Sequence, residues 1–417
     1  MSQAKFNQSN KIAVVGGGAA GLFAASKALE NGAIVTVFER NVSFGKKLNL
    51  TGNGKCNFTN NDLDDSHFRN SEYIKPFLDK YNASYFQDYF LSLGVLSYSK
   101  KNGCLYPSSQ KATTITQSLV RHIEQLGGKM ISGVCISEII QNNSHKFELI
   151  SKEQKIDDVF DCVILACGGK AAPKTGSDGF GFRLARTFGH TVSRTYPVLV
   201  QLKSDSGICK KCSGVRCRVN ASAYINNELL RTEHGELQIT DSGLSGIVIF
   251  QLSRILSKAA EEGKVCEIIV DFLPELSEHD FTDFLNKRLN MSVNDTFYSF
   301  FEGLGNPKLI KCLLNELEID SERIINKDDF DCLISVLFAL KKWKFTITGH
   351  NGYDNAQATR GGVLLNEISP NMESVFTPGL YFAGEMLDVD ADCGGYNLHW
   401  AWTSGEVAGI SAAKKGF

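Results

Sequence analysis

The first forty residues alternate between apolar runs of strand length and a stretch of helical periodicity. Lys11–Val15 is a short apolar run, and Ala33–Phe38 is a second one, rich in β-branched residues. Between them, apolar residues recur at helical spacing from Leu22 to Leu29, and Gly32 stands where a helix should end. The pattern predicts strand, helix and strand in immediate succession.

Similar patterns return farther along the chain. Residues 72–128 and 398–414 have largely helical periodicity, and so does 274–342, where Ser277 and Asp320 are cap-like helix starts. Further apolar runs have the length of strands: 133–140, 146–151, 162–167 and 380–383. Alternating helices and buried strands are typical of an α/β domain.

The N-terminal and C-terminal parts of the chain share a pattern of buried strands and helices that the middle of the chain lacks. We predict one discontinuous α/β domain formed by residues 1–195 and 353–417. Short alternating runs separated by turns predict a β-rich insert at 196–273 and 343–352. Residues 274–342, rich in Leu, Phe and charge, predict a helical insert nested inside it. A substrate cleft is expected where the inserts meet the first domain.

A glycine-rich turn separates the first predicted strand from the first predicted helix. Its glycines are Gly16, Gly18 and Gly21, at the spacing of a dinucleotide-binding turn. In such a turn they permit a tight bend, a close approach of a pyrophosphate, and close packing of helix on sheet. The helix N-terminus, at Ala19 and Ala20, offers N–H groups and a positive dipole end to phosphates.

An acidic residue, Glu39, ends the second predicted strand, and Arg40 follows it. A carboxylate at this place accepts hydrogen bonds from ribose hydroxyls and disfavours a 2′-phosphate. An ordinary glycine-rich turn with a surface glutamate is the alternative interpretation. The glycines and the acid together predict a dinucleotide, but they do not separate FAD from NAD.

The polar loop that follows reads GKKLNLTGNGKCNFTN over residues 45–60. It resembles the signature of bacterial flavoproteins that include aminoacetone oxidase and the flavin reductases of bile-acid 7α-dehydroxylation. Many relatives carry Arg where this chain has Lys55, and Lys lacks the guanidinium fork. The resemblance implies that these residues bind FAD: Lys46, Lys47, Thr51, Gly52, Gly54, Lys55, Cys56 and Asn57.

Two further segments resemble the same family, so the resemblance covers nearly the whole chain. Residues 235–246 read GELQITDSGLSG, and residues 378–402 contain PGLYFAGEMLD and CGGYNLHWAW. In the family the C-terminal segment lines the flavin, and a helix starting near Asn397 would direct its N–H groups at the flavin pyrimidine. The remaining predicted cofactor residues are Val134, Cys167, Gly168, Gly384, Glu385, Asp388, Asn397 and Leu398.

Arg360 is the one catalytic candidate. It lies in the turn Ala358–Val363, which approaches the flavin face in the family, where some relatives have Ala and others Arg. A permanently charged fork beside a flavin could hold a carboxylate or carbonyl of the substrate. The alternative is a surface arginine, because most arginines are exposed.

The amino-acid composition reduces the number of functional classes to which this protein could belong. The 417 residues carry a net charge of −2, which gives no reason to expect nucleic acid or a membrane surface as a partner. No signal peptide or membrane-length apolar run is visible, so a cytoplasmic protein is expected. The twelve cysteines should be reduced thiols, and Cys209, Cys212 and Cys217 lack a fourth ligand, so no metal is expected.

The sequence therefore predicts an α/β fold with a two-dinucleotide-binding-type, Rossmann-like domain. It predicts an oxidoreductase that holds FAD non-covalently and moves a hydride to or from flavin, with an amino ketone, amino acid or enone-like molecule as substrate. No second glycine motif is present to hold a nicotinamide, so NAD(P)H would act only as a transient electron donor. Two alternatives stay open: a tRNA-modifying flavoenzyme, and a flavin-binding protein without turnover of its own.

Overall fold

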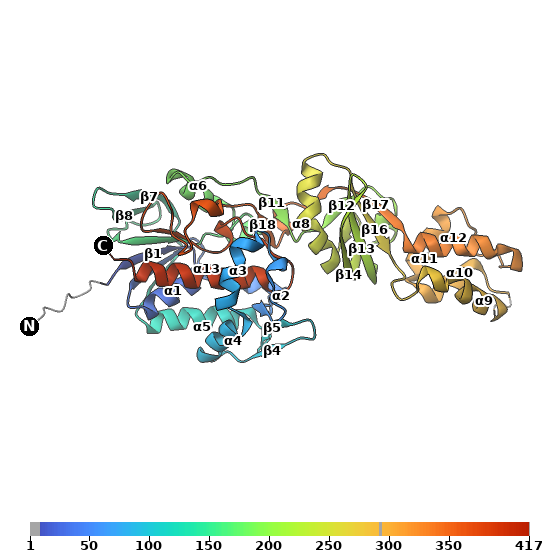
Figure 1. Cartoon of the computed structure of the whole chain (residues 1–417), viewed down its shortest axis with the longest axis horizontal. Coiled ribbons are helices and arrows are strands. Elements are labelled where there is room, and N and C mark those ends of the chain that lie inside the picture. The colour runs from blue at the N-terminus through green and yellow to red at the C-terminus, as the bar shows by residue number, and fades with distance from the viewer. Residues whose placement is uncertain (1–8, 292–293, 417) are drawn as a thin grey trace, which may run out of the picture. The chain divides into compact units, whose positions relative to one another are not determined.

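The chain folds into two compact units (Figure 1). The structure, a computed structural model, describes residues 9–291 and 294–416. The first unit comprises Met1–Tyr196 and Gln357–Phe417, and the second comprises Pro197–Ala356. The described parts of both end segments, from residue 9 and up to residue 416, therefore belong to the first unit. The predicted division of the inserted part into two further domains stays a prediction.

A five-stranded parallel sheet forms the centre of the first unit, with the strand order β19-β10-β1-β2-β6. The strands are β1 (Lys11–Val15), β2 (Ile34–Glu39), β6 (Lys129–Ser132), β10 (Cys162–Leu165) and β19 (Leu380–Phe382). The C-terminal strand β19 pairs with β10, with Val163 opposite Leu380. A parallel sheet that joins both chain ends confirms the predicted α/β, Rossmann-like fold.

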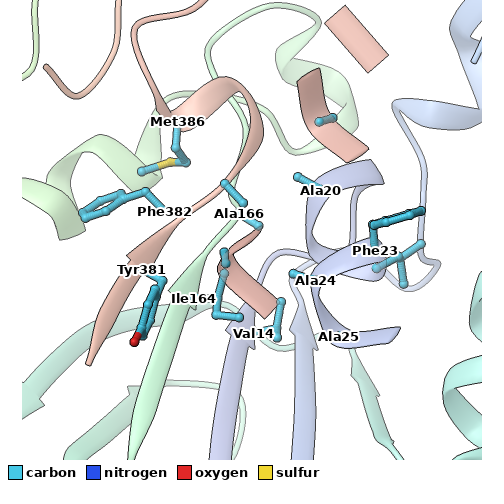
Figure 2. Packing of buried hydrophobic residues seen from close by; sticks show 14 of the residues in the cluster. Val14, Ala20, Phe23, Ala24, Ala25, Ile164, Ala166, Tyr381, Phe382 and Met386 are labelled. Carbon is cyan, nitrogen blue, oxygen red and sulfur yellow. The ribbon is translucent and has the colours of Figure 1, made fainter. Parts of the chain in front are cut away.

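Two helices, α1 (Ala19–Glu30) and α13 (Tyr396–Ala413), pack against each other beside this sheet (Figure 1). Glycines let them approach closely: a Cβ on Gly409 would lie 2.3 Å from the carbonyl oxygen of Ala24. Figure 2 shows Val14 and Ile164 of neighbouring strands packed with Ala24 of α1 in the buried core. Gly405 and Gly409 of α13 thus form its close contact with α1.

The other elements of the first unit surround this core. The helices are α2 (Thr51–Gly54), α3 (Ser71–Lys80), α4 (Ala83–Ser92), α5 (Ala112–Gln125) and α6 (Phe180–Thr187). The minor strands are β3 (Thr59–Asn60), β4 (Ser97–Ser99), β5 (Cys104–Pro107), β7 (Ile136–Gln141), β8 (Phe147–Ser151), β9 (Val159–Phe160) and β18 (Ala358–Arg360). Strands β3, β5 and β4 form one small sheet, and β7, β8 and β9 form another.

The second unit contains a closed antiparallel barrel with the order β12-β15-β14-β13-β16-β17. Its strands are β12 (Leu202–Ser204), β13 (Arg216–Ile225), β14 (Glu228–Thr240), β15 (Gly243–Ser245), β16 (Cys266–Asp271) and β17 (Trp343–His350). Strand β11 (Tyr196–Val198) and helix α7 (Ile208–Lys211) precede and follow β12. A long helix, α8 (Ile247–Glu261), packs on the barrel, which the β-rich pattern did not predict.

The described residues of the segment predicted to be helical form four α-helices: α9 (Phe281–Met291), α10 (Phe297–Phe301), α11 (Pro307–Glu316) and α12 (Phe330–Lys341). Asp320 does not start any of them, so that expectation was wrong. Its carboxylate accepts the N–H of Glu322 at 3.0 Å in the turn after α11. A helix cap and a turn use the same bond from an aspartate side chain, so the sequence cannot separate them.

Candidate cofactor and active site

The glycine turn has the geometry of a nucleotide-binding turn. Gly16 has a φ of +111°, and a Cβ on Gly21 would lie 1.8 Å from the carbonyl oxygen of Gly16, so strand and helix can meet only through glycine. A Cβ on Gly18 would meet nothing within 4 Å. Gly18 is also the N-cap of α1, and no side chain caps this helix. No side-chain cap therefore occupies the first turn of α1, which begins with Ala19 and Ala20.

Glu39, at the end of β2, is bound to the same turn. Its carboxylate accepts the N–H of Gly17 at 2.8 Å, and the backbone and side-chain N–H groups of Asn41 at 2.8 and 2.7 Å. A carboxylate offers about four acceptor positions, so one is left for a ribose hydroxyl. The backbone oxygen of Glu39 accepts the N–H of Val134. The guanidinium of Arg40 donates a hydrogen bond from Nη1 to the carboxylate of Asp178 at 2.7 Å.

The loop after β2 turns through left-handed backbone conformations. Gly52, Asn53, Gly54 and Cys56 have φ values of 57°, 55°, 79° and 58°, which glycine and asparagine tolerate best. Burial raises the pKa of the Cys56 thiol to about 12, so it stays protonated at neutral pH. This explains the glycine and asparagine content of the loop, and it makes Cys56 a packing residue.

The lysines of this loop separate into two kinds. Lys47 is half-buried and pairs with Glu385, with 2.6 Å between Nζ and Oε2. Lys46 and Lys55 are exposed. The side chain of Thr51 donates to the carbonyl oxygen of Leu48 at 2.7 Å and so closes the loop on itself.

Glu385 joins several segments that are distant in the sequence. Its Oε1 accepts the N–H of Thr359 at 2.6 Å, and its Oε2 accepts both Lys47 and the N–H of Gly169 at 3.3 Å. The Thr359 hydroxyl in turn accepts the N–H groups of the two residues after Gly169, at 2.8 and 2.9 Å. Half-buried Arg360 is the next residue on β18. The structure thus brings Arg360 near the predicted cofactor residues Lys47 and Glu385.

The ends of β10 and β19 complete this edge of the sheet. A Cβ on Gly384 would lie 2.8 Å from the Cβ of Ala20, so β19 ends against the first turn of α1. A Cβ on Gly168 would lie 2.9 Å from the hydroxyl oxygen of Ser177. That hydroxyl is buried and has no hydrogen-bond partner among the described residues. Burial raises the pKa of the nearby Cys167 thiol to about 12, which keeps it neutral.

The segment before α13 is held largely by internal bonds. Asp388 pairs with Arg69, whose Nε also donates to Asp390 at 2.8 Å. The side chain of Asn397 points toward the preceding loop, where it accepts the N–H of Ala391 at 3.0 Å and donates to the backbone oxygen of Ala391 at 2.9 Å. These two side chains, predicted at the cofactor, therefore help to fix the loop.

The start of α13 itself is open in the same way as the start of α1. Gly395, with a φ of +98°, is the N-cap, and no side chain caps the helix. The side-chain oxygen of Asn57 is buried without a partner among the described residues, 3.0 Å from where a Gly395 Cβ would stand. Half-buried Leu398 lies in this first turn. Two uncapped helix starts and two unpartnered polar groups fit a bound dinucleotide cofactor.

Four residues that organise the site were not among the candidates: Asn41, Arg69, Ser177 and Thr359. Thr359 lies beside Arg360 in a segment that the sequence analysis had already selected, so its hydroxyl group could have been predicted as a hydrogen-bonding group of the site. Arg69 had none, because its partner Asp388 is 319 residues away. Asn41 lies in a short polar turn, and the side-chain N–H of Asn41 donates to Thr175, which is 134 residues away. The hydroxyl of Ser177 has no partner among the described residues, so no pairing pattern could indicate it.

Other features of the described chain do not compete with this site. A surface cavity of about 430 Å³ lies elsewhere in the first unit, lined by Asn61, Asp64, Lys75 and their neighbours, and none of the predicted residues lines it. Residues 9–291 and 294–416 contain no group of three metal-binding side chains. Cys212 is buried and its thiol lies 3.5 Å from the Lys308 oxygen. In the same ranges no helix has the length and apolarity to cross a membrane.

The first unit has a parallel sheet with a glycine turn, and an acidic residue stands at the position that binds a ribose in dinucleotide-binding domains. A strand and a helix from the C-terminal segment complete this edge of the sheet. These features define a two-dinucleotide-type flavoprotein fold. The model of the HI0933-like protein Rossmann domain family matches residues 10–411. The chain belongs to this family. It is an FAD-dependent oxidoreductase, and the resemblance noted in the sequence is confirmed.

Two curated relatives match along their whole length. The chain is 37% identical over 411 residues to the 3-dehydro-bile acid delta(4,6)-reductase of Clostridium scindens, and the alignment covers 97% of this chain and 100% of that protein. It is 28% identical over 415 residues to the ribosomal RNA dihydrouridine synthase of Haemophilus influenzae, with 98% and 100% covered. A solved 3-ketosteroid-delta4-(5alpha)-dehydrogenase from Rhodococcus jostii aligns over 99% of both chains at 14% identity and a TM-score of 0.48, too distant to inform function.

Proposed function

We propose that this protein reduces a carbon–carbon double bond conjugated to a carbonyl group in a small apolar molecule, by transfer of a hydride from reduced FAD to the β-carbon and addition of a proton to the α-carbon. The observation that carries the proposal is the 37% identity, over 97% of the chain, to a reductase of 3-dehydro-bile acids. A 3-keto group with double bonds at positions 4 and 6 is a conjugated enone. The C5=C6 bond of uridine, which a dihydrouridine synthase reduces, is also conjugated to a carbonyl. The two kinds of relative thus share one reaction class.

The cofactor in this proposal is FAD held without a covalent bond. The pyrophosphate would lie against the open start of α1, between Gly16 and Gly21, with the adenosine ribose on the remaining acceptor position of Glu39. The flavin would lie toward the start of α13, where N–H groups favour negative charge on its pyrimidine side. Exposed Lys46 and Lys55 would add positive charge near the phosphates. When bound, the flavin supplies the hydride chemistry.

Arg360 is our proposed substrate-binding residue. Its neighbour Thr359 is fixed by Glu385, through a 2.6 Å bond, and by the loop after Gly169, so the backbone of Arg360 is held in place. A guanidinium donates two parallel hydrogen bonds to a carbonyl or carboxylate. An enone carbonyl bound in this way gains negative charge as hydride arrives at the β-carbon, and a nearby cation stabilises that charge.

The reductant that we propose is NAD(P)H in a transient complex. The chain has a single Gly-x-Gly-x-x-Gly turn, at residues 16–21, which the proposal assigns to FAD. A nicotinamide would then bind only long enough to reduce the flavin and leave before the substrate enters. An alternative electron source would show itself as slow flavin reduction by both NADH and NADPH.

A second candidate is reduction of uridine in RNA, because ribosomal RNA dihydrouridine synthases from two bacteria align at 28% identity over 94–98% of the chain. Charge argues against it. RNA binding draws most of its affinity from cations on the protein. The net charge here is −2, and the second unit, 197–356, holds more Asp and Glu than Lys and Arg. We therefore rank the small apolar substrate first.

The proposal is tested by product mass. Purified protein with FAD, NADH or NADPH and no oxygen is incubated with a 3-keto-4-ene steroid, a 3-keto-4,6-diene bile acid, an aminoketone and an RNA containing uridine. The expected result is a gain of two mass units on an enone. A gain on RNA alone would favour the second candidate, and no change with any substrate would favour a flavin-binding protein without turnover.

A further inference from the structure

Ser177 carries a buried hydroxyl group at the carboxyl edge of the central sheet. The residue is 6% exposed, and its hydroxyl oxygen has no hydrogen-bond partner among the described residues. The oxygen lies 2.9 Å from where a Cβ on Gly168 would stand, and Gly168 follows strand β10. Buried hydroxyl groups in folded proteins nearly always have a partner. A ligand that supplies the partner would explain this one.

A tight loop, residues 172–178, holds this hydroxyl in place. The N–H and the hydroxyl of Thr175 both donate to the carbonyl oxygen of Ala172, at 2.9 and 2.7 Å. Gly176 has a φ of +96°, a conformation that favours glycine. A Cβ on Gly176 would lie 2.6 Å from the side-chain nitrogen of Asn41. The loop therefore packs directly on a residue that closely follows Glu39.

Two side chains directly after Glu39 bind this loop to the end of β2. The side-chain N–H groups of Asn41 donate to the carbonyl oxygen of Thr175 at 3.0 Å and to the carboxylate of Glu39 at 2.7 Å. The guanidinium of Arg40 donates to the carboxylate of Asp178 at 2.7 Å. One amide thus fixes the Glu39 carboxylate relative to the loop that carries the buried hydroxyl.

The loop and the glycine turn share this edge of the sheet. Strand β1 lies between β10 and β2, so its glycine turn stands between Gly168 and Glu39. A Cβ on Gly16 would lie 3.1 Å from the Cα of Cys167, and the N–H of Gly17 donates to Glu39 at 2.8 Å. The ribose position that we assign to Glu39 therefore has the loop beside it.

The chemistry of the two side chains matches a ribose. A carboxylate can only accept hydrogen bonds, whereas a serine hydroxyl can both donate and accept. Each ribose hydroxyl also donates and accepts, so Glu39 and Ser177 together satisfy more of the ribose than Glu39 does alone. Phosphates need only donors, which the start of α1 supplies without a capping side chain.

We propose that Ser177 binds the ribose in the adenosine part of FAD together with Glu39, and that Asn41 positions both side chains. The inference rests on the cofactor site proposed above and adds to it a residue from a distant segment. Glu39 accepts a hydrogen bond from one ribose hydroxyl, and the hydroxyl of Ser177 bonds to the other. The bound cofactor thereby supplies the partner that the Ser177 hydroxyl lacks within the described chain.

The first test removes the hydroxyl and measures affinity and stability in parallel. Ser177→Ala should raise the dissociation constant for FAD about 3- to 10-fold, the scale of one neutral hydrogen bond. The unfolding temperature of the FAD-free protein should stay the same or rise, because the substitution removes a buried hydroxyl that has no partner. Lower stability with unchanged FAD affinity would mean that Ser177 has only a structural role, and would overturn the inference.

Ser257→Ala is the matched control. Ser257, on α8 in the second unit, is 0% exposed, and its hydroxyl also has no hydrogen-bond partner among the described residues. Because it lies outside the unit that carries the glycine turn, its substitution should leave FAD affinity at the wild-type level. An equal loss of FAD affinity in both variants would contradict a direct contact between Ser177 and the cofactor.

The second test locates the bond on the cofactor by calorimetric titration of the FAD-free protein with two nucleotides. ADP has the ribose and the pyrophosphate without the flavin, and 2′,3′-dideoxy-ADP lacks both ribose hydroxyls. The wild type should bind ADP more tightly than the dideoxy analogue. Ser177→Ala should bind ADP more weakly and the analogue as the wild type does. An equal loss for both nucleotides, or no binding of ADP to the wild type, would overturn the ribose assignment.

The outcomes separate this inference from the proposed function. Wild-type FAD affinity in Ser177→Ala contradicts the ribose role even if enones are reduced. A selective loss of ADP affinity without any enone reduction would support the role of Ser177 and refute the proposed reaction. Failure of the wild-type protein to bind FAD would refute both the cofactor site and the ribose role.

Discussion

Replacing Gly18 by alanine separates an effect on FAD binding from an effect on protein stability. Gly18 has φ −86° and ψ −166°, an extended conformation that any residue adopts, and its Cβ would meet no atom within 4 Å. As an N-cap, alanine is less favourable than glycine by up to about 1 kcal/mol. The free energy of unfolding of the FAD-free protein should therefore fall by no more than about 1 kcal/mol.

FAD binding should respond much more strongly. If the pyrophosphate lies against Gly18, an added methyl group overpacks the contact, which costs about 1–3 kcal/mol. The dissociation constant for FAD should then rise roughly 5- to 150-fold. Fluorescence titration of the FAD-free protein measures it, and thermal unfolding with and without FAD measures the stability in parallel.

Two other glycines provide the controls. Gly207, the N-cap of α7 in the second unit, also has open space around its Cβ and a negative φ, so Gly207→Ala should leave FAD affinity unchanged. Gly21→Ala places a Cβ 1.8 Å from the Gly16 oxygen and should impair folding itself. Wild-type FAD affinity in Gly18→Ala would refute the assignment of the pyrophosphate to this turn.

Three further predictions address the cofactor and the substrate. Glu39→Ala should weaken FAD binding by about 1–3 kcal/mol, and unchanged affinity in the same titration would remove Glu39 from the ribose site. Arg360→Lys and Arg360→Ala should both lose about 2–4 kcal/mol in substrate-dependent flavin oxidation, measured by rapid mixing, while FAD content stays at the wild-type level. Acid denaturation should release a yellow supernatant that analyses as FAD, whereas FMN in the supernatant, or flavin on the precipitate, contradicts non-covalent FAD.

The sequence predicts the part of the fold whose signals are local. The strand at Lys11–Val15, the glycines that follow and the helix behind them lie within twenty consecutive residues, and each has a periodicity or a steric reason of its own. The C-terminal strand and helix were predicted for the same reason, and the helix starts at Tyr396, two residues before the predicted start. Helix α8 was missed, because its surroundings alternate like strands.

The contacts that organise the site are the part that the sequence does not predict. Glu385 and Lys47 are 338 residues apart, and nothing in either segment indicates that their charges meet. Asp388 and Asn397 matched a flavin-lining pattern, but their side chains are bound to Arg69 and Ala391. A resemblance locates a segment in the fold, whereas the direction of each side chain depends on packing between elements that are distant in sequence.

The most direct test of the proposed reaction is an anaerobic single turnover. The protein with FAD is reduced with dithionite until its absorbance near 450 nm is lost, and it is then mixed with a 3-keto-4-ene steroid. The account predicts that the oxidised flavin spectrum returns at a rate that rises with steroid concentration, with one saturated product formed per flavin. If the flavin stays reduced with every conjugated enone, the proposed function is wrong.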